Sequence, residues 1–308
     1  MESVAIHITD GEVAAEPLQE PLAVKAKFSA YIELTKPRIT FLIVLTSAAG
    51  FFLGTREQVD YFRLFHAMFG IAMLSSGIAA LNQFMERDLD RLMRRTAIRP
   101  LPEGRVSPYE AFLFGAGLTI IAEIYLAVFV NPLTALFGIA VIVGYLFVYT
   151  PLKTKTSLST VAGAFPGALP PLLGWTAASN ELEIGAWVLF AIVFLWQFPH
   201  FLAIAWMYKE DYGKAGIVML PVVDPEGHIT ARQIVIYTAT LLPVSLIPTL
   251  IGMTGRAYFV GAFVLGLLFL VSSIVTAVSR TRQRARQLLL VSVIYLPLLF
   301  VLMVFNSR

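Results

Sequence analysis

Residues 64–84 read LFHAMFGIAMLSSGIAALNQF and contain no Lys, Arg, Asp or Glu. A helix needs about 20 mainly apolar residues to cross the hydrocarbon core of a bilayer, so this stretch predicts a transmembrane helix. The residues that follow at once, 85–95, read MERDLDRLMRR and are dense in charge. The sequence here predicts a membrane helix that brings ionisable groups to one edge of the bilayer.

Similar apolar runs recur along almost the whole chain, in keeping with a composition of 57% hydrophobic and only 14% charged residues. Soluble domains carry about twice that charged share. We expect an all-α, polytopic membrane bundle of nine transmembrane helices around a central cavity, occupying residues 31–308. Residues 1–30 lack a long apolar run and are expected to be a disordered cytoplasmic N-terminal tail. Besides 64–84, the predicted crossings are 39–55, 109–129, 132–149, 160–178, 185–206, 234–252, 257–278 and 287–305.

The basic residues predict the orientation of this bundle. Of 23 Lys and Arg, all but four lie on the side of the N terminus, the exceptions being Arg56, Arg63, Arg256 and Arg308. Because Lys and Arg accumulate in cytoplasmic loops, we expect the N terminus in the cytoplasm and the C terminus across the membrane. The acidic start of the chain favours a bacterial inner membrane over a mitochondrial one. The basic stretch 280–286 is interpreted as an anchor to membrane lipids, and no nucleic acid partner is expected.

Three polar side chains at and just after the end of the predicted helix 64–84 suggest a metal site. Asn82, Glu86 and Asp90 are spaced four residues apart, and each such step turns a helix by only ~40°, so they share one stripe. Their oxygens suit a hard cation such as Mg²⁺, which leaves coordination positions to substrate phosphates. Asp88 points ~120° from Asn82 and is a weaker candidate. The alternative is a solvated helix with ion pairs between neighbouring turns.

Cationic side chains near this stripe would bind phosphate oxygens. Arg94, Arg95 and Arg99 follow it, and guanidinium groups make forked hydrogen bonds to phosphate. Lys153 ends another predicted helix and suits either a clamp on diphosphate or an anchor at the membrane surface. The sequence contains no cysteine, so any metal must be held by oxygen or imidazole ligands.

A second set of ionisable residues ends the sixth predicted helix, where His200 is followed by Lys209, Asp211 and Tyr212. In a continuous helix His200 and Asp211 share a face, although Pro199 would kink it. We interpret His200 as a proton acceptor, a contact to the acceptor substrate, or the partner in an inter-helix hydrogen bond. The later residues would form a second metal or phosphate half-site, or an interfacial belt of Lys and Tyr.

Short motifs distributed along the chain carry a family resemblance. They are Thr35-Lys-Pro-Arg38, Asn82-x3-Glu86-x3-Asp90, Met93-x-Arg-Thr96, Arg99-Pro-Leu101, Tyr149-Thr-Pro-Leu-Lys153, Trp196-Gln-x-Pro-His-Phe201, Asp211-Tyr212, Ala215-Gly216 and Met219-Leu-Pro221. With these motifs the sequence resembles the UbiA-type intramembrane prenyltransferases, and within them the branch that farnesylates haem. The resemblance covers almost the whole chain after residue 30.

The chain departs from the family pattern at two points. Glu86 stands where an Asp is usual, which keeps the carboxylate and lengthens its reach. The second acidic motif falls on Tyr208 and Tyr212, which leaves Glu210 and Asp211 as its carboxylates. The resemblance therefore implies metal binding by the first motif more strongly than by the second.

The resemblance implies transfer of farnesyl from farnesyl diphosphate to a vinyl group of haem b, with addition of water, to give haem O and diphosphate. Haem b is then a substrate, Mg²⁺ is the cofactor, and the product would pass to a haem A synthase or a terminal oxidase. Asn82, Glu86 and Asp90 would hold the metal, while His200 would act as a base or contact haem. The alternatives are an aromatic quinone precursor as acceptor or, in a different class, a membrane protein for haem delivery or transport.

Overall fold

The computed structural model describes residues 20–307, with side chains from residue 26 onward. Residues 1–19 of the predicted tail lie outside the described part, whereas residues 20–30 form the start of α1. In chain order the helices are α1 (Glu20–Leu34), α2 (Pro37–Gly54), α3 (Tyr61–Asp90), α4 (Pro108–Phe129), α5 (Pro132–Ile142), η1 (Val143–Tyr149), α6 (Thr150–Leu152), α7 (Ser159–Gly167), α8 (Pro170–Ser179), α9 (Ile184–Met207), α10 (Lys209–Lys214), α11 (Leu220–Val223), α12 (His228–Val244), α13 (Ile247–Leu250), α14 (Arg256–Ser279) and α15 (Arg282–Phe305).

The all-α class is confirmed, but the number of full-length crossings differs from the prediction. Among the described residues, 8 helical stretches are long and apolar enough to cross a membrane, and each overlaps a predicted crossing. The remaining prediction, 160–178, corresponds to two short helices, α7 and α8. Pro170 and Pro171 begin α8, and the missing N–H of a proline interrupts the hydrogen bonds of a helix. The fifth predicted crossing is therefore a broken helix.

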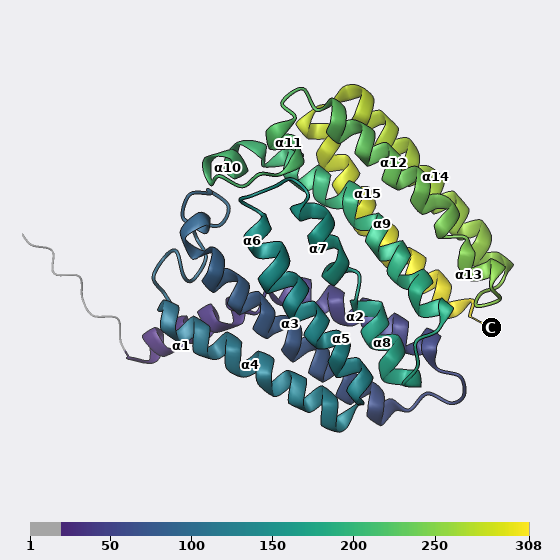
Figure 1. Cartoon of the computed structure of the whole chain (residues 1–308), viewed down its shortest axis with the longest axis horizontal. Helices are drawn as coiled ribbons and strands as arrows, with labels where there is room; N and C mark the ends of the chain where they lie inside the picture. Colours follow the sequence, from purple (N-terminus) through teal and green to yellow (C-terminus); the bar gives the residue numbers. More distant parts are fainter. Residues whose placement is uncertain (1–19, 308) are drawn as a thin grey trace, which may run out of the picture.

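The helices pack as two groups that lie side by side (Figure 1). In one group α3 packs against α4, and α2 against α8, around a core that includes Phe51 and Leu126. In the other, α9, α12, α14 and α15 surround a core that includes Tyr258, Phe269 and Tyr295. Helices α7 and α8 contact α9 and so join the two groups.

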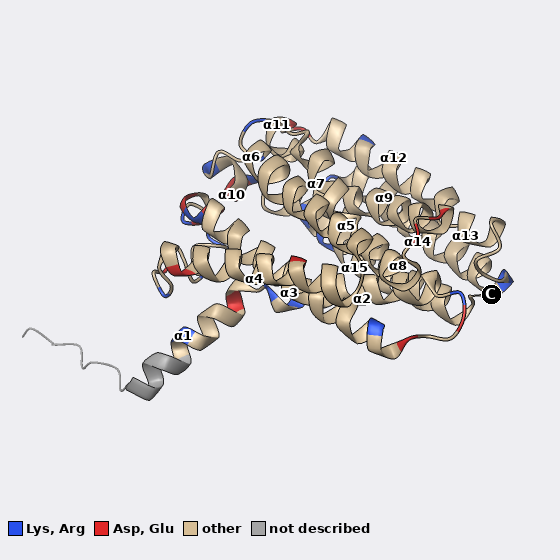
Figure 2. Ribbon diagram, turned by 60° about the horizontal axis from the view of Figure 1, so that its bottom comes forward, with Lys and Arg blue, Asp and Glu red and all other residues tan. Residues whose placement is uncertain are grey.

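Most charged residues gather at one end of the bundle, which Figure 2 shows around α6, α10 and α11. Helix α1 lies toward this end, while the C terminus lies at the far end beside α13 (Figure 1). The placement agrees with the asymmetry of Lys and Arg along the sequence. The predicted functional loops therefore share the polar end of the molecule.

The segment after α5 has an unusual helical form. It winds as a π-helix, η1, before α6 begins, and π-helical turns often occur at functional sites. The sequence predicts a helix end at residue 149, but the chain stays helical through Leu152 and Lys153 follows. Both η1 and α6 contact α3, so this segment brings Thr150 and Lys153 beside the end of that helix.

Candidate active site

Helix α3 ends in the predicted stripe, which faces the interior of the bundle. Asn82 and Asp90 are 1% exposed and Glu86 is 7% exposed. The side chain of Asp88, in contrast, is 70% exposed and lies 3.8 Å from that of Arg91. A solvated helix would expose the stripe as well, so that alternative does not hold for Asn82, Glu86 and Asp90.

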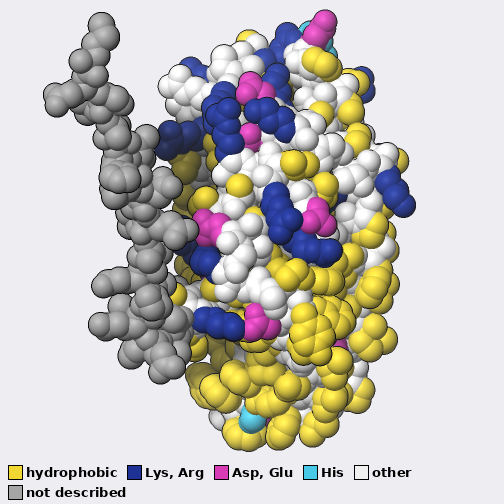
Figure 3. All heavy atoms as spheres, turned by 90° about the vertical axis from the view of Figure 1, so that its left-hand side faces the viewer, with side chains coloured by type: hydrophobic (Ala, Val, Ile, Leu, Met, Phe, Trp, Pro, Cys, Tyr) yellow, Lys and Arg dark blue, Asp and Glu magenta, His cyan; other side chains and the backbone are white. Residues whose placement is uncertain are grey.

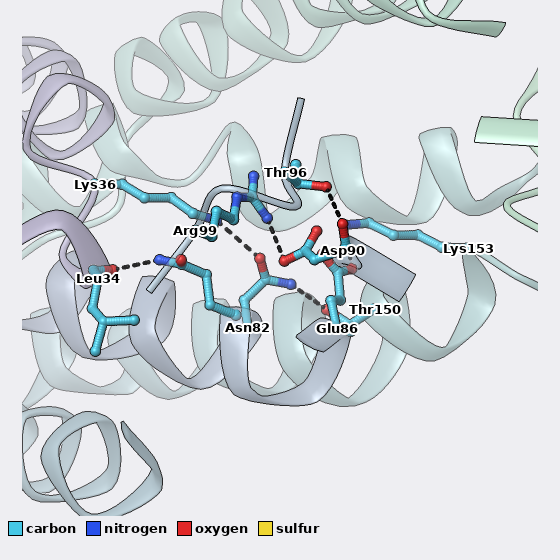
Figure 4. A network of polar contacts seen from close by, with 10 residues as sticks. Leu34, Lys36, Asn82, Glu86, Asp90, Thr96, Arg99, Thr150 and Lys153 are labelled. Carbon is cyan, nitrogen blue, oxygen red and sulfur yellow. Dashed lines mark hydrogen bonds and ion pairs between the residues drawn. The ribbon is translucent and has the colours of Figure 1, made fainter. Parts of the chain in front are cut away.

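Each side chain of the stripe contacts one cationic side chain from another part of the chain (Figure 4). The cations approach from opposite sides, with Lys36 and Arg99 on one and Lys153 on the other. We call these six side chains the buried network. The pairs are Lys36 Nζ with Asn82 Oδ1 at 3.0 Å, Arg99 Nη1 with Asp90 Oδ2 at 2.7 Å, and Lys153 Nζ with Glu86 Oε1.

Lys36 enters the network from the short junction between α1 and α2. Its backbone adopts the left-handed conformation, with φ of 48°, which non-glycine residues rarely adopt. Gln83, next to the stripe on α3, donates from Nε2 to the carbonyl of Leu34 at 2.9 Å. This bond ties the end of α1 to α3, and the turn then directs Lys36 at Asn82.

Two threonines fix the segments that carry the other cations. Thr96 Oγ1 donates to the backbone carbonyl of Asp90 at 2.9 Å, which folds the loop after α3 back so that Arg99 reaches the helix end. Asn82 Nδ2 donates to Thr150 Oγ1 at 3.2 Å, which fixes α6 to α3. The network thus joins three segments that are distant in sequence.

The two lysines differ in their electrostatic surroundings, although both lie just outside the membrane-spanning helices. Burial, reinforced by the nearby charge of Arg99, lowers the pKa of Lys36 to about 7. Burial also opposes charging Lys153, but Tyr149 and Glu86 outweigh it and raise the pKa of Lys153 above its ordinary value. Lys153 is therefore a fixed positive charge, whereas Lys36 would gain its full charge beside an added anion.

An apolar cavity of about 130 Å³ extends from Lys36 into the bundle. It lies between the group of α2 and α3 and the segment from α5 to α8, and most of its wall is aliphatic. This places water-excluding space directly beside the buried network. Its lining residues are Lys36, Ile39, Ile43, Ile71, Leu74, Ser75, Ile78, Ala79, Val141, Tyr145, Pro166, Gly167, Pro170 and Leu173.

Other predicted site residues line a second, polar cleft of about 610 Å³ at the surface. Figure 3 shows this end of the molecule, where Lys and Arg side chains surround a few acidic ones. The structure thus divides the predicted phosphate-binding cations: Arg99 and Lys153 join the buried network, and the others line what we call the surface cleft. Its lining residues are Arg94, Arg95, Trp206, Met207, Tyr208, Lys209, Glu210, Asp211, Arg280 and Arg282.

His200 lies inside α9 and bonds to the neighbouring helix α15. Its Nδ1 is 2.8 Å from Ser292 Oγ, and its ring stacks on Trp196 with the centroids 4.6 Å apart. Helix α9 continues through Pro199 and ends at Met207, and α10 begins at Lys209. His200 and Asp211 therefore belong to different helices and do not share one continuous face.

The loops after the second and sixth predicted helices meet, as the sequence predicts. Tyr212 is buried in a cluster with Met93 from the loop after α3 and with Ala215. The backbone N–H of Val218 donates to the carbonyl of Lys153 at 2.7 Å, which joins the same region to the end of α6. Tyr212 thus packs in the apolar cluster that joins the loop after α3 to the segment that follows α9.

Residues 43–302 match the UbiA prenyltransferase family. The chain belongs to this family. A protein of Solibacter usitatus named protoheme IX farnesyltransferase is 52% identical over 285 residues, which cover 90% of this chain and 98% of the relative. A protein of the same name from Koribacter versatilis is 47% identical over 302 residues, covering 94% of this chain and 97% of the relative.

Solved structures of other proteins share the fold. A structure of digeranylgeranylglyceryl phosphate synthase aligns with a TM-score of 0.77 at 16% identity, covering 91% of this chain and 98% of that one. A UbiA homologue from Archaeoglobus fulgidus bound to DMAPP and Mg²⁺ aligns with a TM-score of 0.63 at 18% identity, covering 89% and 99%. At these identities the likeness establishes the common helical arrangement.

The stripe on α3 fits the magnesium ion that a UbiA prenyltransferase implies. Asp90 Oδ1 is buried without a hydrogen-bond partner, and an unpaired buried oxygen of this kind is costly unless a ligand satisfies it. Within the described part of the chain no three His, Cys, Asp or Glu gather as a metal site, and the third oxygen of the stripe comes from the amide of Asn82. Two carboxylates and an amide suit Mg²⁺, which also takes water and substrate phosphates.

Sequence reasoning did not assign site roles to Lys36, Thr150 and Ser292. Lys36 lies in the Thr-Lys-Pro-Arg motif, and a lysine before a proline at a membrane boundary was the available signal. Thr150 is likewise inside a quoted motif. Ser292 is a serine in an apolar helix with no distinguishing neighbour, so only the packing of α15 against α9 identifies it.

Proposed function

We propose that this UbiA prenyltransferase transfers farnesyl from farnesyl diphosphate to a vinyl group of haem b. The observation that carries the proposal is the buried network, in which three oxygen donors and three cations meet beside an apolar cavity. The names of the relatives at 52% and 47% identity support haem as the acceptor. The product would be haem O, released for a haem A synthase or a terminal oxidase.

The reaction breaks the carbon–oxygen bond to diphosphate, forms one carbon–carbon bond, and forms one new carbon–oxygen bond to water. The electron pair of the carbon–oxygen bond leaves with diphosphate, and the vinyl group attacks the allylic carbon that remains. The positive charge left on the former vinyl group is captured by water, which loses a proton to give the hydroxyl. The protein must therefore stabilise a leaving anion and admit water after the new carbon–carbon bond has formed.

The cations of the buried network suit the first of these tasks. Lys36, Arg99 and Lys153 would bind the diphosphate oxygens, because each is preorganised by a contact that also holds the stripe on α3. Asn82, Glu86 and Asp90 would hold Mg²⁺, whose positive charge stabilises the leaving diphosphate. Charges fixed in place before the reaction need no reorganisation when the anion develops.

The apolar cavity suits the part of the farnesyl chain nearest the diphosphate, because its volume of about 130 Å³ is smaller than that of a whole farnesyl group. Its wall lies against Lys36, so a chain inside it would place its diphosphate end at the network. The cavity would also keep bulk water from the allylic carbon, where hydrolysis would waste the substrate. The protein thus separates a dry pocket for the chain from a charged pocket for the leaving group.

His200 is our candidate for directing the water or contacting haem. It already forms an inter-helix hydrogen bond to Ser292, so a purely structural role has direct support. The His200→Ala variant separates these roles: a catalytic or haem-contacting His200 predicts loss of haem O formation in a protein that melts normally. Full haem O formation by this variant would rule out both functional roles.

We also propose that the polar end of the bundle faces the cytoplasm. The chain has no native cysteine, so single cysteines report orientation directly. Lys155→Cys lies at the polar end and Glu57→Cys at the other. In inside-out bacterial vesicles an impermeant maleimide should label the first and spare the second; the reverse pattern would overturn the orientation.

The central test uses purified full-length protein in liposomes with haem b, farnesyl diphosphate and Mg²⁺. Chromatography and mass spectrometry should detect haem O, and a chelator should abolish it. Parallel reactions with a hydroxybenzoate would detect transfer to an aromatic ring instead. Farnesylation of that ring alone would replace haem as the acceptor, and no release of diphosphate with any acceptor would favour haem delivery or transport.

A further inference from the structure

The surface cleft gathers more positive than negative charge from three separate segments. Its cations are Arg94 and Arg95 from the loop after α3, Lys209 from α10, and Arg280 and Arg282 from the junction of α14 and α15; Glu210 and Asp211 are its acids. Convergence of arginines from distant segments favours a bound anion, because forked guanidinium groups bind carboxylates and phosphates in pairs of hydrogen bonds.

The size and walls of the cleft fit more than a single small ion. Its volume of about 610 Å³ is that of pockets that accept a whole small molecule. Trp206 and Tyr208 supply aromatic surface in the wall, and the guanidinium of Arg95 lies 5.2 Å from the centre of the Tyr208 ring. A planar, partly apolar ligand with an anionic edge would match both the aromatic and the cationic parts of this lining.

The cleft and the buried network share one loop of the chain. The loop after α3 carries Arg94 into the cleft and Arg99 into the buried network. Between them Met93 packs against Tyr212. This loop therefore links the cleft to the site where prenyl transfer is proposed.

Helix α9 makes a second connection. Met207 lines the cleft, and His200 lies seven residues earlier, about two turns and ~10 Å deeper on nearly the same face. Arg282 begins α15 at the cleft, and Ser292, further along α15, bonds to His200. The α9–α15 pair thus leads from the cationic rim toward the depth of the membrane.

We propose that the surface cleft binds the two propionate carboxylates of haem b, so that the opposite, vinyl-bearing edge points toward the buried network. This inference rests on the proposed function, because it takes haem as the acceptor. Haem is an amphiphile whose dianionic edge needs cations near water while its apolar body enters the protein. The five cations of the cleft, against two acids, supply that complement at the polar end of the molecule.

The first test needs no variant. Full-length protein in nanodiscs of zwitterionic lipid is titrated with haem b and with haem b dimethyl ester, and binding is followed by the absorbance of haem. Esterification removes both carboxylate charges, so the ester should bind roughly 10- to 100-fold more weakly. Equal affinities for the two haems would overturn the proposal.

The second test removes one arginine from each of two walls, with the double variant Arg94→Ala/Arg282→Ala. Haem b should bind roughly 10- to 100-fold more weakly, the dimethyl ester should bind as it does to the wild type, and lysine at both positions should restore part of the loss. The matched control is Arg284→Ala/Arg286→Ala in the same basic stretch, outside the lining of the cleft. Arg284 bonds to Gln287 instead, and the control should bind haem b normally.

Three outcomes separate this inference from the proposed function. Normal haem b binding by the double variant, with haem O formed by the wild type, would overturn the cleft and leave the function intact. Arginine-dependent haem binding without any farnesyl transfer would overturn the function and retain the cleft. A further set of nanodiscs contains phosphatidylglycerol. If the double variant loses only its binding to this lipid and keeps its affinity for haem b, the cleft is an anchor for anionic lipid and the proposal is wrong.

Discussion

The buried network and the surface cleft use the same side-chain types in different proportions. In the network each of the three side chains on α3 contacts one cation, whereas in the cleft five cations stand against two acids. A buried charge without a partner costs several kcal/mol, so both carboxylates of the network are paired, and Lys36, whose partner is the neutral amide of Asn82, has its pKa lowered to about 7. At the surface water and salt screen the surplus, so an excess of cations can be kept ready for a ligand.

The largest effect on haem O formation is expected from Asp90, the carboxylate of the network whose Oδ1 has no hydrogen-bond partner. Asp90→Asn keeps the shape and removes the charge, so we expect haem O formation to fall by about 100- to 1,000-fold. Asp88→Asn, on the exposed face of the same helix, should match the wild type. Both are measured by chromatography of the haem product, and an Asp90→Asn enzyme with half of the normal activity would remove the metal site from α3.

Lys153→Ala should lower both stability and turnover, because it leaves Glu86 buried without a partner. We expect about 3 kcal/mol of destabilisation and a loss of turnover of about 10- to 100-fold. Adding Glu86→Gln should restore the melting temperature but not the turnover. The control is Lys155→Ala, which removes an exposed lysine two residues away. An equal loss of stability and turnover in this control would show that any change in the loop causes the loss, rather than removal of the Lys153–Glu86 pair.

Single arginine variants should show that the buried network and the surface cleft bind different substrates. Arg99→Ala should raise the KM for farnesyl diphosphate about tenfold and leave the KM for haem b unchanged. Arg94→Ala should raise the KM for haem b and leave the KM for farnesyl diphosphate unchanged. Steady-state kinetics with each substrate varied in turn would measure this, and the same KM pattern for both variants would mean that network and cleft are one site.

The smallest effect is expected from an exposed ion pair at the other end of the bundle. Arg56 contacts Glu181 and Glu183, but all three side chains are substantially exposed. Water competes for such pairs, so Arg56→Ala should leave the melting temperature and the haem O yield essentially unchanged. A large drop in melting temperature would show that exposure alone does not separate weak from strong pairs in this protein.

The sequence predicts the parts of this structure that follow from repeating patterns. Uninterrupted apolar runs locate the long spans, because the bilayer imposes their length. The four-residue spacing of Asn82, Glu86 and Asp90 places them on one stripe, because helical geometry is nearly invariant. Motif spacing also identifies the family. These inferences need no knowledge of how distant segments pack.

The sequence does not predict which cation joins which region. Arg94, Arg95 and Arg99 lie within six positions of one another, yet the bond from Thr96 to the Asp90 carbonyl turns only Arg99 into the network. The break between α7 and α8 also escapes a count of apolar residues, since Pro170 and its neighbour are compatible with an apolar run. Such features depend on tertiary contacts rather than on local periodicity.

The π-helical winding of η1 keeps the network in register although the segment holds one residue more than α-helical winding would. A π-helical turn holds an additional residue compared with an α-helical one, so deleting one residue within Val143–Tyr149 would allow the segment to rewind as an α-helix. Because the π turn already takes up the additional residue, the chain beyond it would keep nearly the same orientation, and Lys153 would still face Glu86. A codon lost in η1 would thus preserve this contact, whereas a codon lost from α3 between Asn82 and Glu86 would rotate the two halves of the stripe by about 100° relative to each other.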